Sequence, residues 1–264
     1  MGYKNIGWFT TGRDEAALQL LKEVYSKVEE GFIPLEVRYV FLSKDPDEGK
    51  WAKEIKRFCS EKNIELICLP ASKFEADLKK ENIELWRERY HDEILNLIPK
   101  DVDFGLLAGY MWIVSERFCK EIRLINLHPA LPGGPKGAWE DVMWQLISAR
   151  AYETGAMMHL VTPELDEGPA ISYFRINLRT EEFGQLWRDA EKYLLKLHLS
   201  GVRDKFGNDF PLFKKIREEE VKREVPLIIF TLKYLAEGKI DLSALELPKD
   251  LSQEIESYLE TLQK

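Results

Sequence analysis

The chain lacks the features of secreted, disulfide-bonded proteins. Its 264 residues include three cysteines, Cys59, Cys68 and Cys119, which are odd in number and show no Cys-x-x-Cys spacing. Residues 1–6 lead directly into a first strand and contain no apolar segment typical of a signal peptide. These absences favour reduced, mostly buried thiols in a cytoplasmic protein.

Long apolar runs are also missing. The longest covers residues 225–230 and continues to residue 236, but Lys233 interrupts it. This run is too short to span a membrane, so a packed core helix is the better prediction. The sequence also shows no internal repeat, low-complexity tract or linker that would mark a domain boundary.

An excess of positive charge is absent too. The net charge is −8, which removes the general electrostatic argument for binding nucleic acid or an anionic membrane. With 45% hydrophobic and 32% charged residues, the composition is typical of a folded globular protein. The length suits one large domain, with or without an appendage.

Apolar strands and helical patterns alternate through the first half of the chain. Strands are expected at about residues 6–10, 37–42, 64–69, 102–108 and 121–125, and helices at about 15–28, 49–62 and 73–97. Repeated strand–helix units with apolar strands predict a mostly parallel α/β sheet with helices on both faces. In such a sheet, ligands bind at the carboxyl ends of the strands.

The second half is predicted to begin with a helix at about residues 137–152. Strands at 155–161 and 170–178 follow, joined by a polar loop over residues 162–169. From residue 180 to the end we expect helices, broken by a loop around residues 207–211.

Asn126 and His128 stand where the fifth strand ends, because Pro129 has no N–H to continue a ladder. Residues two apart on a strand point to the same side, so the two side chains would project together. An amide donor beside an imidazole suits a reaction that develops an oxyanion and moves a proton. Taken alone, the pair is also consistent with a polar strand terminus that holds a satisfied histidine.

Three sequence motifs occur in the chain in the same order as in a known family. They read LAGYMWIV at residues 107–114, NLHPALP at 126–132, and HLVTPELDEGP at 159–169. Together they resemble the folate-dependent formyltransferases, most closely the phosphoribosylglycinamide formyltransferases, whose motifs read AGYMRIL, NIHPSLLP and HFV…ELDGGP. The resemblance extends to about residue 240 and implies a Rossmann-like formyltransferase fold.

The resemblance implies catalytic roles for three residues. Asn126 matches the asparagine that stabilises the oxyanion, His128 the histidine that handles the proton, and Asp166 the carboxylate that orients it or assists transfer. A carboxylate beside an imidazole favours the protonated ring, which can act as an acid. Alone, Asp166 would also be consistent with an ordinary turn residue before Gly168.

The family's formyl donor is 10-formyltetrahydrofolate, and the resemblance implies that two segments bind it. The pocket residues carried over are Met111, Trp112, Ile113, Val114, Thr162 and Leu165. Trp112 stands where the family often has arginine, which alters contacts to the folate tail. His159 matches a histidine near the acceptor, although a satisfied strand histidine is an equal alternative. The resemblance implies no metal and no nicotinamide.

The first strand–helix turn departs from the family's glycine-rich phosphate loop. It reads Thr11-Gly12-Arg13-Asp14-Glu15, in which Gly12 and Arg13 are the candidates for binding an acceptor phosphate. The two acidic residues would repel an anion, and Asp14 could instead cap the helix. The glycine- and proline-rich stretch at residues 130–137 also points to an altered acceptor site.

We therefore expect a formyltransferase domain at residues 1–240, with a helical insertion at about 179–215, and a helical tail at 241–264. The expected reaction transfers a formyl group to a primary amine of a small, phosphorylated acceptor. Glycinamide ribonucleotide of purine biosynthesis is the leading candidate, and a homodimer is possible. An amino-sugar nucleotide N-formyltransferase and a non-catalytic folate-binding relative are alternatives. A formyltetrahydrofolate hydrolase is a third, disfavoured because those enzymes carry an N-terminal regulatory domain.

Overall fold

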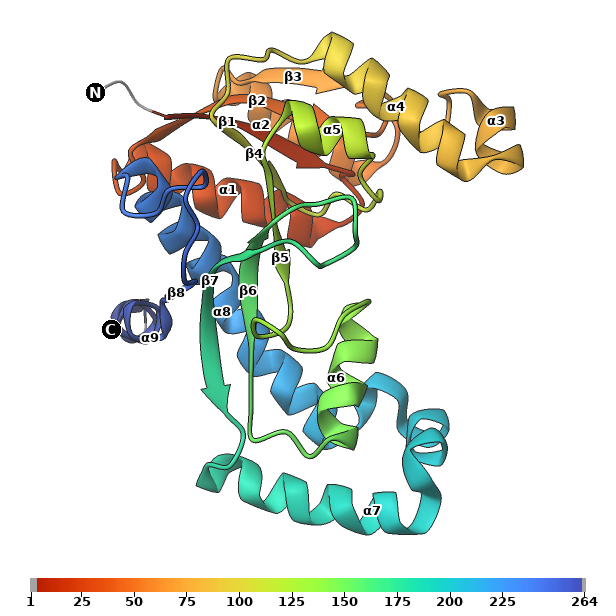
Figure 1. Ribbon diagram of the computed structural model, residues 1–264, viewed down its shortest axis with the longest axis vertical. Helices are drawn as coiled ribbons and strands as arrows, with labels where there is room; N and C mark the ends of the chain where they lie inside the picture. The colour runs from red at the N-terminus through yellow and green to blue at the C-terminus, as the bar shows by residue number, and fades with distance from the viewer. Residues whose placement is uncertain (1–3, 263–264) are drawn as a thin grey trace. The chain divides into compact units, whose positions relative to one another are not determined.

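The computed structural model describes residues 4–262 (Figure 1). Residues 1–3 of the expected formyltransferase domain and 263–264 of the expected tail lie outside the described residues. The chain divides into two compact units. Among the described residues, the first unit comprises residues 4–127, 159–169 and 231–245, and the second comprises 128–158, 170–230 and 246–262.

The first unit is built on parallel strands in the order β3-β2-β1-β4-β5. Its strands are β1 (Lys4–Thr10), β2 (Leu35–Leu42), β3 (Glu65–Cys68), β4 (Phe104–Leu107) and β5 (Leu124–His128, whose last residue belongs to the second unit). Its helices are α1 (Glu15–Glu29), α2 (Lys50–Glu61), α3 (Ala76–Glu81), α4 (Ile83–Leu97) and α5 (Glu116–Glu121). The predicted parallel α/β sheet is confirmed.

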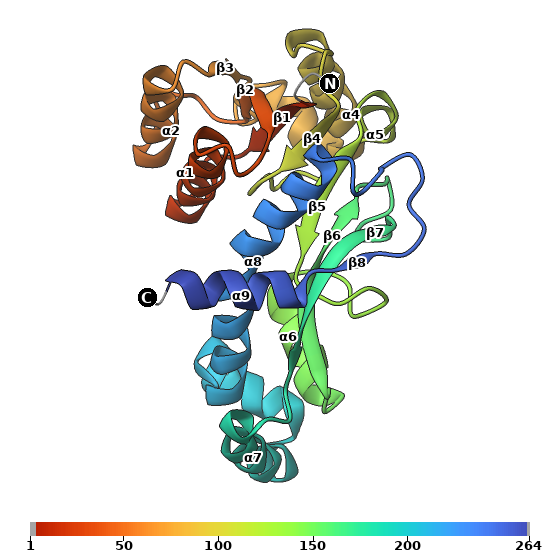
Figure 2. The same ribbon diagram turned by 90° about the vertical axis from the view of Figure 1, so that its left-hand side faces the viewer.

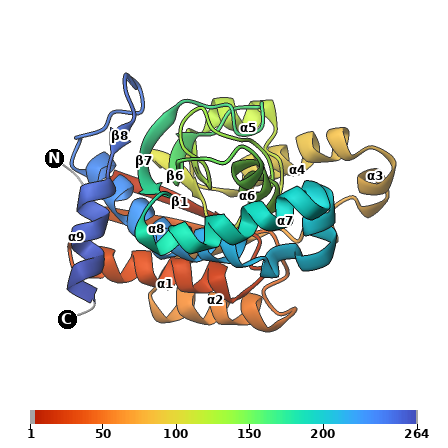
Figure 3. The same ribbon diagram turned by 90° about the horizontal axis from the view of Figure 1, so that it is seen from below.

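Helices cover both faces of this sheet, as the sequence predicted. Figure 2 shows α1 and α2 on one side of β1 and β2, and α4 and α5 on the other. Figure 3 shows α1 and α2 side by side. Strand β1 presents apolar side chains to both faces of the sheet, because each face is covered by a layer of helices. Its Ile6, Trp8 and Phe9 are fully buried.

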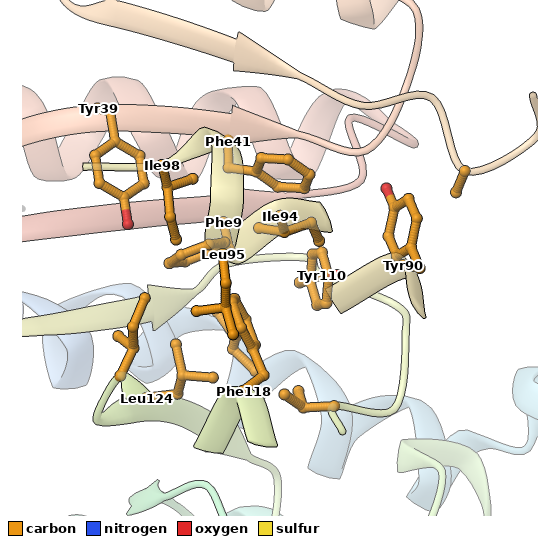
Figure 4. Packing of buried hydrophobic residues seen from close by; sticks show 14 of the residues in the cluster. Phe9, Tyr39, Phe41, Tyr90, Ile94, Leu95, Ile98, Tyr110, Phe118 and Leu124 are labelled. Atoms are coloured by element: carbon orange, nitrogen blue, oxygen red, sulfur yellow. The ribbon is translucent and has the colours of Figure 1, made fainter. Parts of the chain in front are cut away.

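Aromatic side chains fill the layer beneath α4 and α5 (Figure 4). Phe9 meets Phe118 edge to face, with ring centroids 5.5 Å apart, and contacts Phe41 at 5.8 Å. Edge-to-face pairs place the positive edge of one ring on the negative face of the next. This packing attaches α5 to the centre of the sheet.

One predicted helix is divided in two. Residues 73–97 were expected to form a single helix, but α3 ends at Glu81 and α4 begins at Ile83. Asn82 between them is extended, with φ −149°, and its side chain accepts the N–H of Leu85 at 3.0 Å. A capping asparagine accepts an otherwise unpaired N–H group at the start of a helix. A new helix therefore begins after Asn82, and the preceding one ends before it.

The second unit contains β6, β7 and β8 as neighbours in that order. Its elements are α6 (Trp139–Ser148), β6 (Glu153–Leu160, whose last two residues belong to the first unit), β7 (Ala170–Asn177), α7 (Glu181–Phe206), the short 3-10 helix η1 (Gly207–Asp209), α8 (Pro211–Ala236, which ends in the first unit), β8 (Lys249–Asp250) and α9 (Ser252–Leu262). Strands β7 and β8 are parallel.

The helices expected after residue 180 are present, with two differences. Residues 237–248 form turns, bends and irregular chain where helix was expected, and β8 was not anticipated because two residues leave no periodic signal. Aromatic contacts hold α6 against the start of α8: the Trp144 ring lies 5.1 Å from that of Phe213 on α8 and 5.8 Å from that of Phe210, the residue before this helix.

The remaining expectations concern thiols and membranes. All three cysteines are free; Cys59 is buried and the other two are half-buried. Burial raises the pKa of the Cys59 thiol to about 12. No helix within residues 4–262 is both long and apolar enough to cross a bilayer.

A carboxyl group lies fully buried in the second unit. Glu220 on α8 accepts a 2.7 Å hydrogen bond from the Thr154 hydroxyl, and Arg217 lies 3.5 Å from its other oxygen. Arg217 is paired mainly with Glu224. Burial raises the pKa of Glu220 to about 8, because the hydration lost by its charged form outweighs the opposing effects of the Thr154 hydrogen bond and of Arg217.

We predict that this group makes stability fall with rising pH. The folded-state pKa of about 8 exceeds the ordinary value of 4.5, so the folded protein retains a proton that the unfolded chain releases. The free energy of unfolding should lose roughly 3–4 kcal/mol between about pH 5 and 8 through Glu220. Urea unfolding across this range should show a flatter profile for Glu220→Gln. Glu218→Gln, an exposed neighbour on α8, should keep the wild-type slope. Parallel profiles for wild type and Glu220→Gln would contradict the assignment.

Candidate active site

A cavity of about 200 Å³ lies in the first unit, at the carboxyl ends of β4 and β5. It is lined by Leu107, Tyr110, Met111, Trp112, Ile113, Val114, Asn126, His159, Val161, Thr162, Pro163, Leu165 and Asp166. All six residues expected to bind the folate donor are among them. Of the expected catalytic residues, the cavity brings Asn126 and Asp166 together.

Much of the cavity wall is apolar and exposed to solvent. Met111, Ile113 and Leu165 are 56%, 40% and 57% exposed, although large apolar side chains ordinarily pack inside a protein. Exposed apolar side chains gathered in a concave site are typical of a ligand pocket. The two loops that carry them, residues 111–114 and 162–165, face one cavity, as the motifs predicted.

His159 and Asp166 form the most polar part of the wall. The Nδ1 atom of His159 lies 3.1 Å from the carbonyl oxygen of Leu160, and its Nε2 lies 3.9 Å from Oδ1 of Asp166. A carbonyl oxygen can only accept, so this contact places the hydrogen of a neutral ring on Nδ1. Nε2 is then the atom through which the ring could exchange a proton toward the carboxylate.

The loop that carries Asp166 is held by a close backbone contact. The N–H of Leu160 donates to the carbonyl of Pro169 at 3.0 Å, and a Cβ on Gly168 would lie 1.6 Å from the carbonyl oxygen of Leu160. Asp166 itself is left-handed, with φ +56°, a conformation that aspartate tolerates better than most residues. Glycine at position 168 therefore permits the turn that directs Asp166 into the cavity.

The segment that forms the other wall follows Gly109, which lies two residues after β4. The carbonyl oxygen of Gly109 accepts both the N–H of Thr11 at 3.1 Å and the Thr11 hydroxyl at 2.6 Å. Gly109 has φ +68°, and a Cβ there would approach Ala17 at 3.2 Å. These contacts tie the start of the lining segment to the end of β1.

Trp112 is fixed by two residues that do not line the cavity. Its indole N–H donates to the Ser43 hydroxyl at 3.2 Å, and the Lys79 ammonium lies 4.0 Å from its ring centroid. Burial lowers the pKa of Lys79. Trp112 stands where the family that the motifs resemble often has arginine, and the structure places Lys79 of α3 over the tryptophan ring.

His128 is the one expected catalytic residue that does not line the cavity. It is buried at the end of β5 and is counted in the second unit, where its Nε2 lies 2.9 Å from the carbonyl oxygen of Pro135. The carbonyl accepts, so Nε2 carries the hydrogen in this contact. Along β5, His128 and Asn126 are two residues apart and therefore share one side of the strand.

Gly12 and Arg13 lie outside the main cavity. Gly12 has φ +59°, and Arg13 borders a second cavity of about 200 Å³ that also includes Gly109 and Met111. Arg13 is exposed and its Nε lies 2.9 Å from Oδ2 of Asp14. Oδ1 of Asp14 accepts the N–H of Ala17 at 3.2 Å, so the capping interpretation of this residue is confirmed.

Several lining residues were not among those expected, namely Leu107, Tyr110, Val161 and Pro163. Each lies inside or beside a motif already recognised, so the motif boundaries could have identified them. For metals, the described part of the chain contains no group of three or more His, Cys, Asp or Glu residues placed to hold an ion.

The close contact at Gly168 leads to a stability prediction. Gly168→Ala should cost about 2–4 kcal/mol of unfolding free energy, because the loop must move to relieve an overlap with backbone atoms. Gly184→Ala is the matched control, since a Cβ there meets nothing nearer than Arg188 at 3.6 Å inside a helix. Thermal unfolding of both variants tests this. Equal midpoints would show that the loop yields without cost.

Comparison with known proteins agrees with this geometry. The family model for formyl transferase matches residues 20–184, more than half of the chain. Formyltetrahydrofolate deformylase 1, mitochondrial, of Arabidopsis thaliana is 31% identical over 183 residues, which cover 66% of this chain and 50% of that protein. The match thus spans about half of that relative. Phosphoribosylglycinamide formyltransferase of Dictyostelium discoideum is 28% identical over 162 residues, 57% of this chain and 74% of that protein.

The fold has a counterpart among solved structures. Glycinamide ribonucleotide transformylase 1 from Symbiobacterium toebii superposes with a TM-score of 0.60 at 18% identity, covering 94% of this chain and 92% of that one. This likeness confirms the expected Rossmann-like fold. With the family match and the three motifs, it leads to one conclusion: the chain belongs to the formyl transferase family.

Proposed function

We propose that the protein transfers the formyl group of 10-formyltetrahydrofolate to a primary amine of a small acceptor. The observation that carries this proposal is the cavity itself. It sets an apolar, exposed wall, suited to a flat pterin ring, against the polar groups of Asn126, His159 and Asp166. The leading acceptor is glycinamide ribonucleotide, the substrate named for one of the relatives.

The proposed reaction proceeds in steps, and each step is assigned to one or more polar side chains. The amine nitrogen attacks the formyl carbon, and the carbonyl oxygen becomes an oxyanion to which the Asn126 carboxamide donates. The amine then loses a proton, the bond between carbon and N10 breaks, and N10 takes up a proton. We assign the proton transfers to His128 and Asp166, with His159 sharing the Asp166 carboxylate.

Hydrolysis to formate is the second candidate function. It uses the same oxyanion, with water in place of the amine, and one relative is named a deformylase. The first turn favours it over a phosphorylated acceptor, because the Asp14 carboxylate already occupies the start of α1 and pairs with Arg13. A helix start that holds its own carboxylate has less attraction for an anion.

One assay separates the candidates. Turnover of 10-formyltetrahydrofolate is measured with glycinamide ribonucleotide, with amino-sugar nucleotides, and without an acceptor. Formylated glycinamide ribonucleotide is the expected product. Equal rates of formate release with and without acceptors would establish hydrolysis. Tight folate binding with no turnover in any mixture would indicate a non-catalytic relative.

The catalytic assignment predicts a separation of rate from binding. Asp166→Asn keeps the shape of the side chain but removes its charge, so kcat should fall by roughly 10²-fold or more while folate affinity changes little. Glu164→Gln, the same change at an exposed position of the same loop, should leave kcat near wild type. His128→Ala should lose turnover similarly. Near-wild-type kcat in either catalytic variant would refute the mechanism.

The acceptor assignment predicts the effect of Arg13. If the acceptor carries a phosphate, Arg13→Ala should raise its KM roughly tenfold and leave kcat unchanged, which is the pattern of lost uniform binding. Arg57→Ala removes a similarly exposed, ion-paired arginine on α2 and should have no effect. Unchanged KM in Arg13→Ala, with glycinamide ribonucleotide turned over well, would place the phosphate elsewhere.

A further inference from the structure

We propose that His91 is a positioning residue that clamps both ends of the cavity-lining segment 111–114 and thereby preorganises it for the folate donor. This inference rests on the proposed function, since the donor is the ligand of that cavity. His91 lies on α4, is fully buried and is not itself among the lining residues.

The two ring nitrogens of His91 contact the residues on either side of the segment. The N–H of Ser115 donates to Nδ1 at 3.3 Å, and Nε2 lies 3.1 Å from the Tyr110 hydroxyl. A backbone amide can only donate, so Nδ1 carries no hydrogen and Nε2 donates to Tyr110. Burial lowers the pKa of His91 to about 4, which keeps the ring neutral near pH 7. One neutral imidazole thus serves as acceptor at one end and donor at the other.

The positions of the two partners give the clamp its effect. Tyr110 directly precedes the lining segment, and Ser115 directly follows it. Ser115 also caps α5, since its hydroxyl accepts the N–H of Phe118. Met111 and Ile113, in contrast, are held out in solvent, where burial contributes little to their position. Trp112 is held by Ser43 and Lys79 and Val114 is buried, so Met111 and Ile113 depend for their positions on these two neighbours and on the ends of the segment.

Histidine meets a requirement here that an apolar ring would not. The imidazole stacks on Phe118, with ring centroids 5.1 Å apart and planes at 26°, so phenylalanine could fill the same space. It would, however, leave the Ser115 amide and the Tyr110 hydroxyl in a buried place without this partner. Buried polar groups that lose a partner favour rearrangement of the chain that carries them.

A clamp of this kind acts on binding more than on chemistry. If the segment is already ordered, the donor does not bear the entropic cost of ordering it. Releasing the ends should weaken the donor complex while leaving the Asn126 and Asp166 side chains in place. The expected signature is a raised KM and Kd for the donor with kcat nearly unchanged.

The test compares His91→Phe with Phe118→Leu. His91→Phe keeps the stacking and removes both contacts, whereas Phe118→Leu disturbs the same stack and keeps both contacts. We expect 5-formyltetrahydrofolate to bind His91→Phe roughly tenfold more weakly by calorimetry. Phe118→Leu should bind within twofold of wild type although its thermal midpoint falls. Equal weakening in both variants, or none in His91→Phe, would overturn the proposal.

Two further variants separate the ends and guard against misfolding. The amide oxygen of His91→Asn can replace Nδ1 toward Ser115, and the amide nitrogen of His91→Gln can replace Nε2 toward Tyr110. Each should recover part of the affinity lost in His91→Phe. If both bind folate as weakly as His91→Phe, the two contacts do not carry the effect.

Amide hydrogen exchange without ligand separates this proposal from the proposed function. Residues 111–115 should exchange faster in His91→Phe than in wild type, and at the wild-type rate in Phe118→Leu. If wild-type protein does not bind 5-formyltetrahydrofolate, the proposed function fails, but the exchange comparison still decides whether His91 orders the segment. Unchanged exchange in His91→Phe would overturn the clamp whatever the ligand.

Discussion

The first unit depends on β4 lying between β1 and β5, with all three strands parallel. This pairing brings the loops after β1, β4 and β5 to one edge of the sheet. The backbone groups of each loop need hydrogen-bond partners there. The carbonyl of Gly109 links the loop after β4 to the loop after β1, because it accepts both hydrogen bonds from Thr11. The cavity lies at this edge, between the segment that follows β4 and the loop that follows β6.

The walls of the cavity differ in how they are supported. The loop that carries Asp166 is fixed by close backbone contact at Gly168, so its geometry follows from main-chain sterics. The segment from Met111 to Val114 is supported by Lys79 of α3, which lies over the Trp112 ring, and by His91 of α4, which contacts the residues that flank the segment. A rigid loop facing a tied but exposed segment is a common arrangement in sites that combine chemistry with ligand recognition.

The sequence predicted the parts of this site that lie inside recognisable motifs. Strand–helix periodicity predicted the parallel sheet. The three motifs, through their resemblance to the family, predicted that both lining segments, Asn126 and Asp166 belong to one site, and the structure places these residues around one cavity. Neither the periodicity nor the motifs could identify His91, which is 19 residues from Tyr110 and 24 from Ser115 and lies in a helix that shows only its apolar period. The cap at Asn82 was missed because helical spacing continues through it. For Asp14 the sequence offered two interpretations, repulsion of an anion and a helix cap, and the structure confirms the cap at the start of α1.

The buried carboxyl of Glu220 has a calorimetric consequence. Near neutral pH the folded protein holds a proton on this group that the unfolded chain gives up. Unfolding therefore transfers a proton to the buffer, and the heat that accompanies it includes the buffer's own enthalpy of protonation. Unfolding enthalpies measured in phosphate and in Tris at one pH should therefore differ in proportion to the difference between the two buffers' protonation enthalpies. The contact between β6 and α8 thus exchanges a proton with solvent each time the protein unfolds.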